Sequence, residues 1–118
     1  MLIECKKDNE KIAMGLLSYL DDFKNINVLK EEIELNKNSS EFQLYLYREL
    51  NLNFIGVIGI QNYKDFIVVR YLSLSPNYRQ LRYKGKIIHE LACNNPDKRI
   101  TALPEFTKLV EYFKNKEL

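Results

Sequence analysis

Four basic residues stand close together between positions 79 and 86, in a sequence whose charges are otherwise balanced. The stretch reads RQLRYKGK and contains no acidic residue. It follows Pro76 and leads into a segment with helical periodicity, so it is interpreted as a basic loop before a helix. The first turn of a helix offers unpaired N–H groups and a partial positive charge, which favours a small anionic ligand such as a phosphate. A solvated charged turn is the alternative that the residues leave open.

The residues best suited to nucleophilic or metal chemistry are few and scattered. His89 is the single histidine, and its spacing places it off the apolar side of its helix, where we expect a solvated side chain. Of the two cysteines, Cys5 and Cys93, the second is expected to be a small buried residue, because no histidine or strong cation adjoins it. One histidine and two cysteines are too few for a zinc site, so no metal is predicted.

The composition is that of one ordinary globular domain. The chain has 118 residues, of which 46% are hydrophobic and 29% charged, and its net charge is +2. This balance does not demand a nucleic-acid or anionic-membrane partner. No apolar run approaches the roughly 20 residues that cross a bilayer, and the first residues lack the hydrophobic stretch of a signal peptide. We therefore expect a single domain over residues 1–118, located in the cytoplasm, with reduced cysteines.

The first half of the chain is predicted to begin with a strand and two helices that support these residues. Residues 1–6 alternate weakly, as in a strand. Asp8 or Asn9 then caps a helix with apolar residues at helical spacing, and a second helix covers about 27–36. The acidic side chains of this second helix are expected to face outward.

The hydrophobic period then changes to that of an antiparallel meander. The predicted strands are 42–47, 54–60 and 66–74. Gly56 and Gly59 within the middle strand indicate a bulge or a close approach of neighbouring groups. A helix ending near 94–96, a short strand over 99–103 and a last helix opened by Pro104 complete the order β-α-α-β-β-β-α-β-α. This order predicts an α/β fold with a mixed central sheet and helices on both faces.

The segment at 72–79, LSLSPNYR, resembles the acetyl-CoA-binding motif of the GNAT acetyltransferases. That motif is an aliphatic strand end, a proline, an aromatic residue, and then Arg/Gln-x-x-Gly-x-Gly/Ala leading into a helix. The order of elements is similar to that of the GNAT fold as well, so the resemblance covers nearly the whole chain. The stretch at 11–20, KIAMGLLSYL, further resembles the small RibT-like members, which accompany riboflavin-biosynthesis genes.

The resemblance implies that acetyl-CoA is the co-substrate and assigns its contacts. The pantetheine arm would pair with the backbone of Leu72, Ser73 and Leu74, between two splayed parallel strands that end at Leu74 and Leu103. The pyrophosphate would rest on backbone N–H groups of the loop and the helix start. The cofactor-binding residues implied in that region are Arg79, Gln80, Leu81, Arg82, Tyr83, Lys84 and Gly85.

The chain departs from the motif at its glycines, which let the backbone approach the phosphates closely. Aligning Arg79 with the leading Arg/Gln puts Arg82 and Lys84 where glycines are expected, and shifting the alignment recovers Gly85 alone. Two outcomes are open. Either Arg82 and Lys84 replace backbone contacts by charge-assisted bonds to phosphate, or their side chains fill the cleft and CoA binding is lost.

The resemblance also implies transfer of an acetyl group to an amine, which needs a proton acceptor and a proton donor. The carboxylate that many GNAT enzymes carry on the strand before the motif is absent from residues 66–74, and Glu90 and Glu105 are distant alternatives. The donor is usually a tyrosine of the last helix, and Tyr112 is the candidate here. Many GNAT domains continue with two further strands, so the resemblance implies a C-terminally truncated domain whose exposed edge favours a homodimer.

Three functions remain in view from the sequence. The leading hypothesis is an acetyltransferase that passes acetyl from acetyl-CoA to an amine of an unknown acceptor, in or near riboflavin biosynthesis. The second is a non-catalytic module of the same fold that binds CoA or docks onto a protein. The third makes the basic stretch a nucleic-acid contact, with Tyr78 and Tyr83 as stacking platforms, and the near-neutral charge makes it the weakest.

Overall fold

The computed structural model describes residues 1–37, 39–50 and 53–103. The predicted helix after Pro104, with Tyr112 and Glu105, lies outside these described residues. Short 3-10 turns at Asp21–Phe23 and Pro76–Tyr78 join the elements on either side of the sheet. The strands and α-helices are β1 (Leu2–Glu4), α1 (Glu10–Leu17), α2 (Ile26–Leu35), β2 (Phe42–Tyr47), β3 (Gly56–Asn62), β4 (Phe66–Leu74), α3 (Leu81–Asn94) and β5 (Arg99–Ala102).

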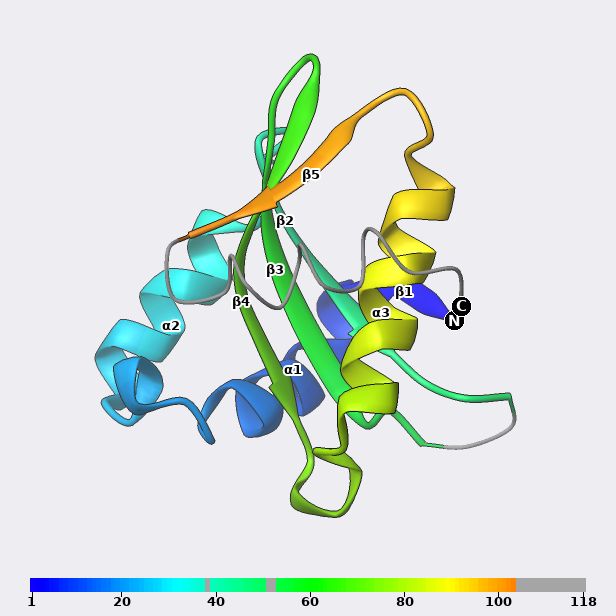
Figure 1. The fold of residues 1–118 in the computed structure, drawn as a ribbon. Helices are drawn as coiled ribbons and strands as arrows, with labels where there is room; N and C mark the ends of the chain where they lie inside the picture. The colour runs from blue at the N-terminus through cyan, green and yellow to red at the C-terminus, as the bar shows by residue number, and fades with distance from the viewer. Residues whose placement is uncertain (38, 51–52, 104–118) are drawn as a thin grey trace.

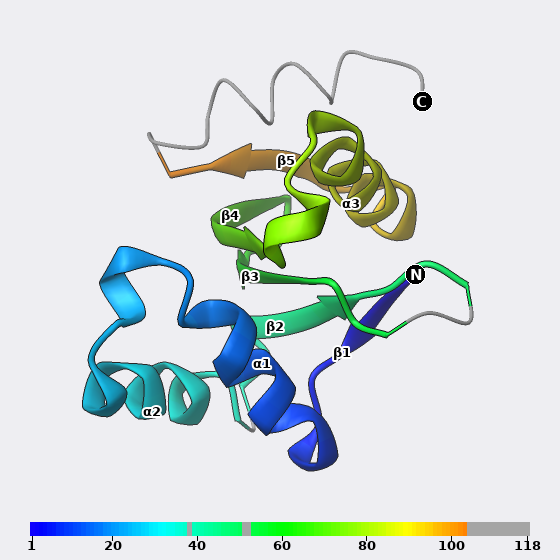
Figure 2. The ribbon, with the colours of Figure 1, turned by 90° about the horizontal axis from the view of Figure 1, so that it is seen from below.

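The five strands form one sheet in which spatial order follows sequence order, β1-β2-β3-β4-β5. The first four pair antiparallel, and β5 pairs parallel with β4, so α3 forms the crossover that a parallel pair requires. Helices α1 and α2 cover one face of the sheet and α3 covers the other (Figure 1, Figure 2). The predicted mixed sheet with helices on both faces is confirmed.

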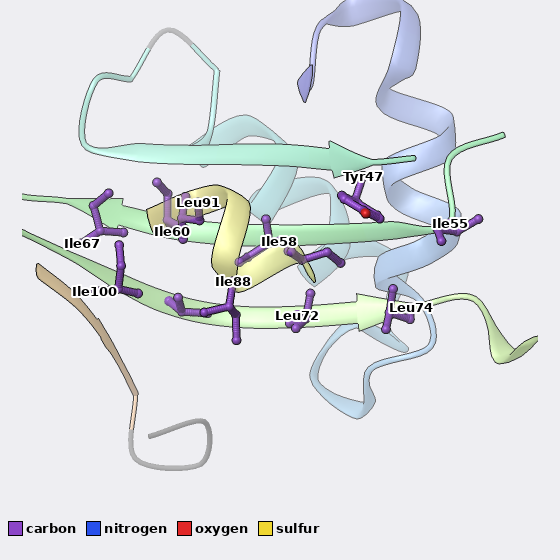
Figure 3. Packing of buried hydrophobic residues seen from close by; sticks show 12 residues of the cluster. Tyr47, Ile55, Ile58, Ile60, Ile67, Leu72, Leu74, Ile88, Leu91 and Ile100 are labelled. Carbon is purple, nitrogen blue, oxygen red and sulfur yellow. The ribbon is translucent and has the colours of Figure 1, made fainter. Parts of the chain in front are cut away.

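Each face of the sheet buries its own hydrophobic core. The core under α3 combines Ile87, Ile88 and Leu91 with apolar residues of β3 and β4. Figure 3 shows Ile88 and Leu91 of this core from close by. The core under α1 and α2 is built on Leu17, Leu46 and other side chains of the opposite face. The nearly all-apolar sequence of β3 follows from this arrangement, because a central strand covered on both faces has no solvated side.

A β-bulge interrupts the pairing of β3 and β4. The register shifts between Gly59, which lies opposite Tyr71, and Ile60, which lies opposite Val69, so Arg70 is an extra residue on β4. A bulge of this kind places two successive side chains on one side of the sheet. Arg70 and Tyr71 therefore both face α2. The glycine pair was predicted to mark a bulge of the middle strand or a close approach. The extra residue lies in β4 and not in the glycine-containing β3, whereas the close approach is confirmed, because a Cβ on Gly59 would lie 2.2 Å from Cζ of Tyr71.

Strands β4 and β5 are paired over part of their length. The last paired residues of the two strands are Val69 and Ala102. The N–H of the next residue, Leu103, donates to the Val69 carbonyl at 3.1 Å. Beyond that point β4 continues to Leu74, and β5 crosses at an angle near one end of β4 (Figure 1). The carboxyl-terminal half of β4 therefore lies beyond its pairing with β5, and we call the divergence of these two strands the wedge.

The bulge also decides which backbone groups of β4 point into this wedge. The N–H of Ser75 bonds the Ile55 carbonyl at 2.8 Å, so the alternating bonds to β3 fall on Ser75, Ser73 and Tyr71. The backbone groups of Leu72 and Leu74 consequently point away from β3, on the side where β5 has diverged. This is the strand segment to which the sequence resemblance assigned the pantetheine arm.

Candidate active site

The basic stretch lies mainly within the first turns of α3. The helix begins at Leu81, after Gln80 in an extended conformation, so the interpretation of the whole stretch as a loop was wrong. The N–H of Tyr83 bonds the Gln80 carbonyl at 3.1 Å, whereas those of Leu81 and Arg82 precede the first helical hydrogen bond. These two N–H groups and the positive end of the helix therefore lie at the mouth of the wedge.

Arg79 ties the loop to the strand. Its Nε donates to the Leu74 carbonyl at 3.1 Å, and its guanidinium lies 5.1 Å from the centre of the Tyr19 ring. The carbonyl that it occupies is one of the groups that point into the wedge. Arg79 thus occupies the Leu74 carbonyl. The backbone of Leu72, two residues earlier on β4, is left to pair with a ligand in the wedge.

The side chains of the first helical turn are held by aromatic contacts. Arg82 donates to the Tyr83 hydroxyl at 3.0 Å, and its guanidinium lies 4.8 Å from the centre of that ring. Tyr83 and Tyr78 meet edge to face at 5.2 Å and both pack against the core under α3. Two rings committed to each other and to the core are poor platforms for bases, which argues against the nucleic-acid hypothesis.

The positions of Lys84 and Gly85 distinguish the two alignments of the motif. Lys84 is half-buried at the end of the first turn, and Gly85 is buried in the second turn of α3. A small residue is needed where a helix packs closely on a sheet. The buried glycine thus fits the shifted alignment, in which Gln80 leads the motif and Gly85 is its last small residue.

On the other face of the sheet, a carboxylate from α2 reaches the bulge. The prediction that all acidic side chains of α2 face outward was wrong for Glu32, whose side chain is 7% exposed. Arg70 Nη1 and Nη2 donate to its two oxygens at 2.7 and 3.0 Å, and the Tyr71 hydroxyl donates at 2.5 Å. Asn36 adds a fourth donor at 2.8 Å.

These contacts fix the ionisation of the cluster formed by Glu32, Arg70, Tyr71 and Asn36. Burial works against the charge of Glu32, but the hydrogen bonds from Arg70, Tyr71 and Asn36 outweigh it and lower the pKa of the carboxyl. Burial, together with the neighbouring Glu32 charge, raises the pKa of the Tyr71 hydroxyl. At neutral pH the pair is therefore a carboxylate and a protonated phenol, neither of which is a ready proton acceptor.

A hollow of about 400 Å³ adjoins this cluster. Its walls come from Arg70 and Tyr71 of β4, from the turn between α1 and α2, and from Leu103 at the end of β5. The turn contributes the exposed Asp21 and Asp22 beside two apolar residues. The hollow lies on the α1 and α2 side of β4, opposite the face that α3 covers, so β4 separates it from the first turn of α3.

The remaining candidates lie away from both features. Cys93 is exposed, which corrects the prediction of a buried residue, and its Sγ lies 3.5 Å from Nε2 of the half-buried His89 one helical turn earlier. Glu90 accepts the N–H of Leu2 and lies 3.2 Å from the ammonium of Met1, so it fastens β1 to α3. Tyr112 and Glu105 lie outside the described residues.

Clusters of metal-binding side chains and membrane-spanning helices are both absent from the described part of the chain. There, no group of three histidine, cysteine or acidic side chains could hold a metal ion. No described helix combines the length and the apolar character that spanning a membrane requires.

Comparison with known proteins places the chain in a family. No protein-family model matches it. It is 32% identical over 101 residues to an uncharacterised N-acetyltransferase in the lysA 3′ region of Bacillus methanolicus, which covers 85% of this chain and 83% of that protein. The aminoglycoside N-acetyltransferase AAC(6′)-Iy, in complex with the bisubstrate analogue CoA-S-monomethyl-acetylneamine, superimposes with a TM-score of 0.73 at 13% identity, over 99% of this chain and 90% of that one.

A structure described as a putative GNAT-family acetyltransferase from Bacteroides thetaiotaomicron superimposes with a TM-score of 0.67 at 13% identity. This superposition covers 97% of the present chain and 69% of the Bacteroides thetaiotaomicron chain. These structural likenesses establish the fold, and the 32% identity to the Bacillus methanolicus protein establishes the kinship. The chain belongs to the GNAT superfamily of N-acetyltransferases.

Proposed function

We propose that this protein binds acetyl-CoA in the wedge between β4 and β5 and transfers the acetyl group to an amine. The observation that carries the proposal is the wedge itself, with the backbone of Leu72 on one wall and the first turn of α3 at its mouth. Kinship with an N-acetyltransferase supports it, and so does the fold shared with a protein that binds a CoA-containing analogue.

The described residues fit the two parts of the proposed co-substrate. An extended pantetheine arm contains amide groups, which can pair with the Leu72 backbone as an added strand would. The pyrophosphate can accept bonds from the N–H groups of Leu81 and Arg82, and the Arg82 and Lys84 side chains supply positive charge there. Of the two outcomes left open by the missing glycines, we favour charge-assisted binding.

The acceptor is proposed to enter from the hollow on the other side of β4. Acetyl transfer joins the amine nitrogen to the acetyl carbon, breaks the bond from that carbon to sulfur, and leaves a proton on nitrogen and a thiolate. Tyr112 remains the proposed donor to the thiolate. Glu32 already accepts four hydrogen bonds, so we assign it no proton transfer, and water is the simplest acceptor of the amine proton.

A link to riboflavin biosynthesis enters the proposal only through the resemblance of residues 11–20. In the structure this stretch is most of α1 and the turn after it, where Ala13, Leu16 and Leu17 are core residues. It therefore supports the fold rather than a flavin-related acceptor. The acceptor is proposed as an amine, and the non-catalytic module remains the alternative that the experiment separates.

The test is calorimetric titration with acetyl-CoA, followed by an assay of thiol release with a panel of amines. Arg82→Glu reverses a charge at the start of α3, and Lys30→Glu makes the same reversal on the exposed side of α2. We expect Arg82→Glu to weaken acetyl-CoA binding by at least about tenfold and Lys30→Glu to leave it unchanged. No heat at millimolar acetyl-CoA would refute the proposal. Acetyl-CoA binding without thiol release for any amine, and with the same affinity in the Tyr112→Phe variant, would favour the non-catalytic module.

A further inference from the structure

The wall of the hollow beside the bulge includes the positively charged side chain of Arg70, although an amine is proposed to enter there. Among the described residues that line it, Arg70 carries positive charge, whereas Asp21 and Asp22 carry negative charge. An amine is an ammonium ion in neutral solution, so an unbalanced guanidinium in the wall would repel it. Asp21 and Asp22 are exposed, so solvent screens their charges, whereas the Arg70 side chain is 19% exposed. The acceptance of an amine by the hollow therefore depends strongly on what neutralises Arg70.

Glu32 neutralises it at contact distance. The two nitrogen-to-oxygen distances, 2.7 and 3.0 Å, form a bidentate pair, the strongest geometry available to these groups. The guanidinium also lies 5.1 Å from the centre of the Phe42 ring and 5.3 Å from that of Tyr71. Arg70 thus contacts a carboxylate and two aromatic rings, and the Glu32 carboxylate neutralises its charge.

The same carboxylate orients the second wall residue. The Tyr71 hydroxyl donates to Glu32 at 2.5 Å, and the ring meets Phe23 edge to face at 5.2 Å. Gly59 lies directly beneath the ring. Because Glu32 does not line the hollow itself, any effect it has on an acceptor is exerted through Arg70 and Tyr71.

We propose that Glu32 is a positioning residue that sets the acceptor class: by neutralising Arg70 and fixing Tyr71, it makes the hollow able to take a cationic amine. This inference rests on the proposed function and adds the substrate class to it. The bulge is what makes it possible, because it turns two successive side chains of β4 toward one carboxylate. In an uninterrupted strand, residues 70 and 71 would point to opposite faces.

The experiment compares Glu32→Gln with Glu31→Gln, the same change at the exposed neighbouring residue of α2. Spermidine, ethylenediamine and neamine serve as amine probes, and KM is measured separately for each amine and for acetyl-CoA. We expect Glu32→Gln to raise the amine KM on the order of tenfold, most for the most highly charged probe, and to leave the acetyl-CoA KM unchanged. Glu31→Gln should change neither.

A double variant separates charge from structure. Glu32→Gln together with Arg70→Gln removes both charges and leaves a pair of amides, so the amine KM should return toward the wild-type value. A purely structural role of Glu32 predicts instead that the double variant is no better than the single one. Thermal unfolding and acetyl-CoA titration of each variant identify any that fail to fold. If Glu32→Gln fails to fold, the double variant is compared with Glu31→Gln in its place.

Three further results would overturn the inference and can be told apart. Equal amine KM values for the wild type and Glu32→Gln refute the charge argument while leaving acetyl transfer intact. A wild-type protein that binds acetyl-CoA but takes none of the three amines, by turnover or by calorimetry with CoA present, refutes the cationic acceptor. A protein that does not bind acetyl-CoA refutes the proposed function, and the inference with it.

Discussion

At the scale of single residues, Gly59 shows most directly how the sequence allows the bulge. A Cβ placed on Gly59 would lie 2.2 Å from Cζ of Tyr71, a ring that the Glu32 bond and the Phe23 contact hold in place. We expect Gly59→Ala to lower the free energy of unfolding by about 2 to 4 kcal/mol, because the ring has to move and lose those contacts. Urea denaturation measures the change.

Gly15 provides the matched control. It lies in the interior of α1, and a Cβ there would meet no atom within 4 Å. Gly15→Ala should therefore raise the free energy of unfolding by about 0.5 to 1 kcal/mol, as alanine is the better helix former. If Gly59→Ala were as well tolerated as Gly15→Ala, the Tyr71 ring would not be fixed, and the positioning role of Glu32 would lose its basis.

The residues that sequence reasoning missed share a physical cause. Glu32 stands in a helix beside Glu31 and Glu34, and nothing in that local pattern distinguishes the one carboxylate that is buried. Its partners Arg70 and Tyr71 are 38 and 39 positions away, and both reach it only because of the bulge. Cys93 was misplaced for a similar reason, since exposure within a helix depends on which neighbouring element covers it.

At the scale of elements, the Glu32 cluster fastens α2 to β4, and its pH dependence has a definite sign. The pKa of Glu32 is lowered in the folded protein, chiefly through hydrogen bonds that overcome the burial cost. A lowered carboxyl pKa gives stability that is complete above the ordinary value of 4.5 and is lost as pH falls through the folded value. The wild type should lose stability below about pH 4.5 partly through this contact.

The measurement is the midpoint of urea unfolding from pH 3 to pH 7. Glu32→Gln should cost about 2 kcal/mol at pH 7, because one partner of a largely buried ion pair is lost, and its stability should fall less steeply in acid. Glu31→Gln, at an exposed site, should follow the wild-type curve. Parallel curves for the wild type and Glu32→Gln would contradict the assignment of the lowered pKa to this cluster.

Element order was the part of the fold most accessible from the sequence. Runs of strand-forming and apolar residues located β2, β3 and β4, and the proline after β4 located the turn that leads to α3. The start of α3 was less accessible, because a stretch rich in arginine and lysine resembles a loop until its packing is known. In the structure the helix begins at Leu81, and Gly85 is buried in its second turn.

At the scale of the whole molecule, the distribution of charge matters more than its sum. The net charge of +2 predicts no strong attraction to a polyanion, yet Arg82 and Lys84 lie at the positive end of α3. The acidic side chains that offset them include Asp21 and Asp22, which line the hollow on the other side of β4. Basic and acidic side chains thus lie on opposite sides of β4, as the proposed binding of acetyl-CoA on one side and of an amine on the other requires.

A thermal-shift comparison of two thioesters tests this separation. Acetyl-CoA at 100 times its dissociation constant should stabilise the fold by about 2.7 kcal/mol, which for a domain of this size raises Tm by roughly 10 °C. S-acetylpantetheine has the arm without the phosphates, so its shift at equal concentration should be much smaller. Because phosphate contacts are screened by salt, the acetyl-CoA shift should shrink between low and high ionic strength, while that of S-acetylpantetheine should not. Equal, salt-independent shifts would mean that the phosphates do not contact the start of α3, and that the wedge holds the arm alone.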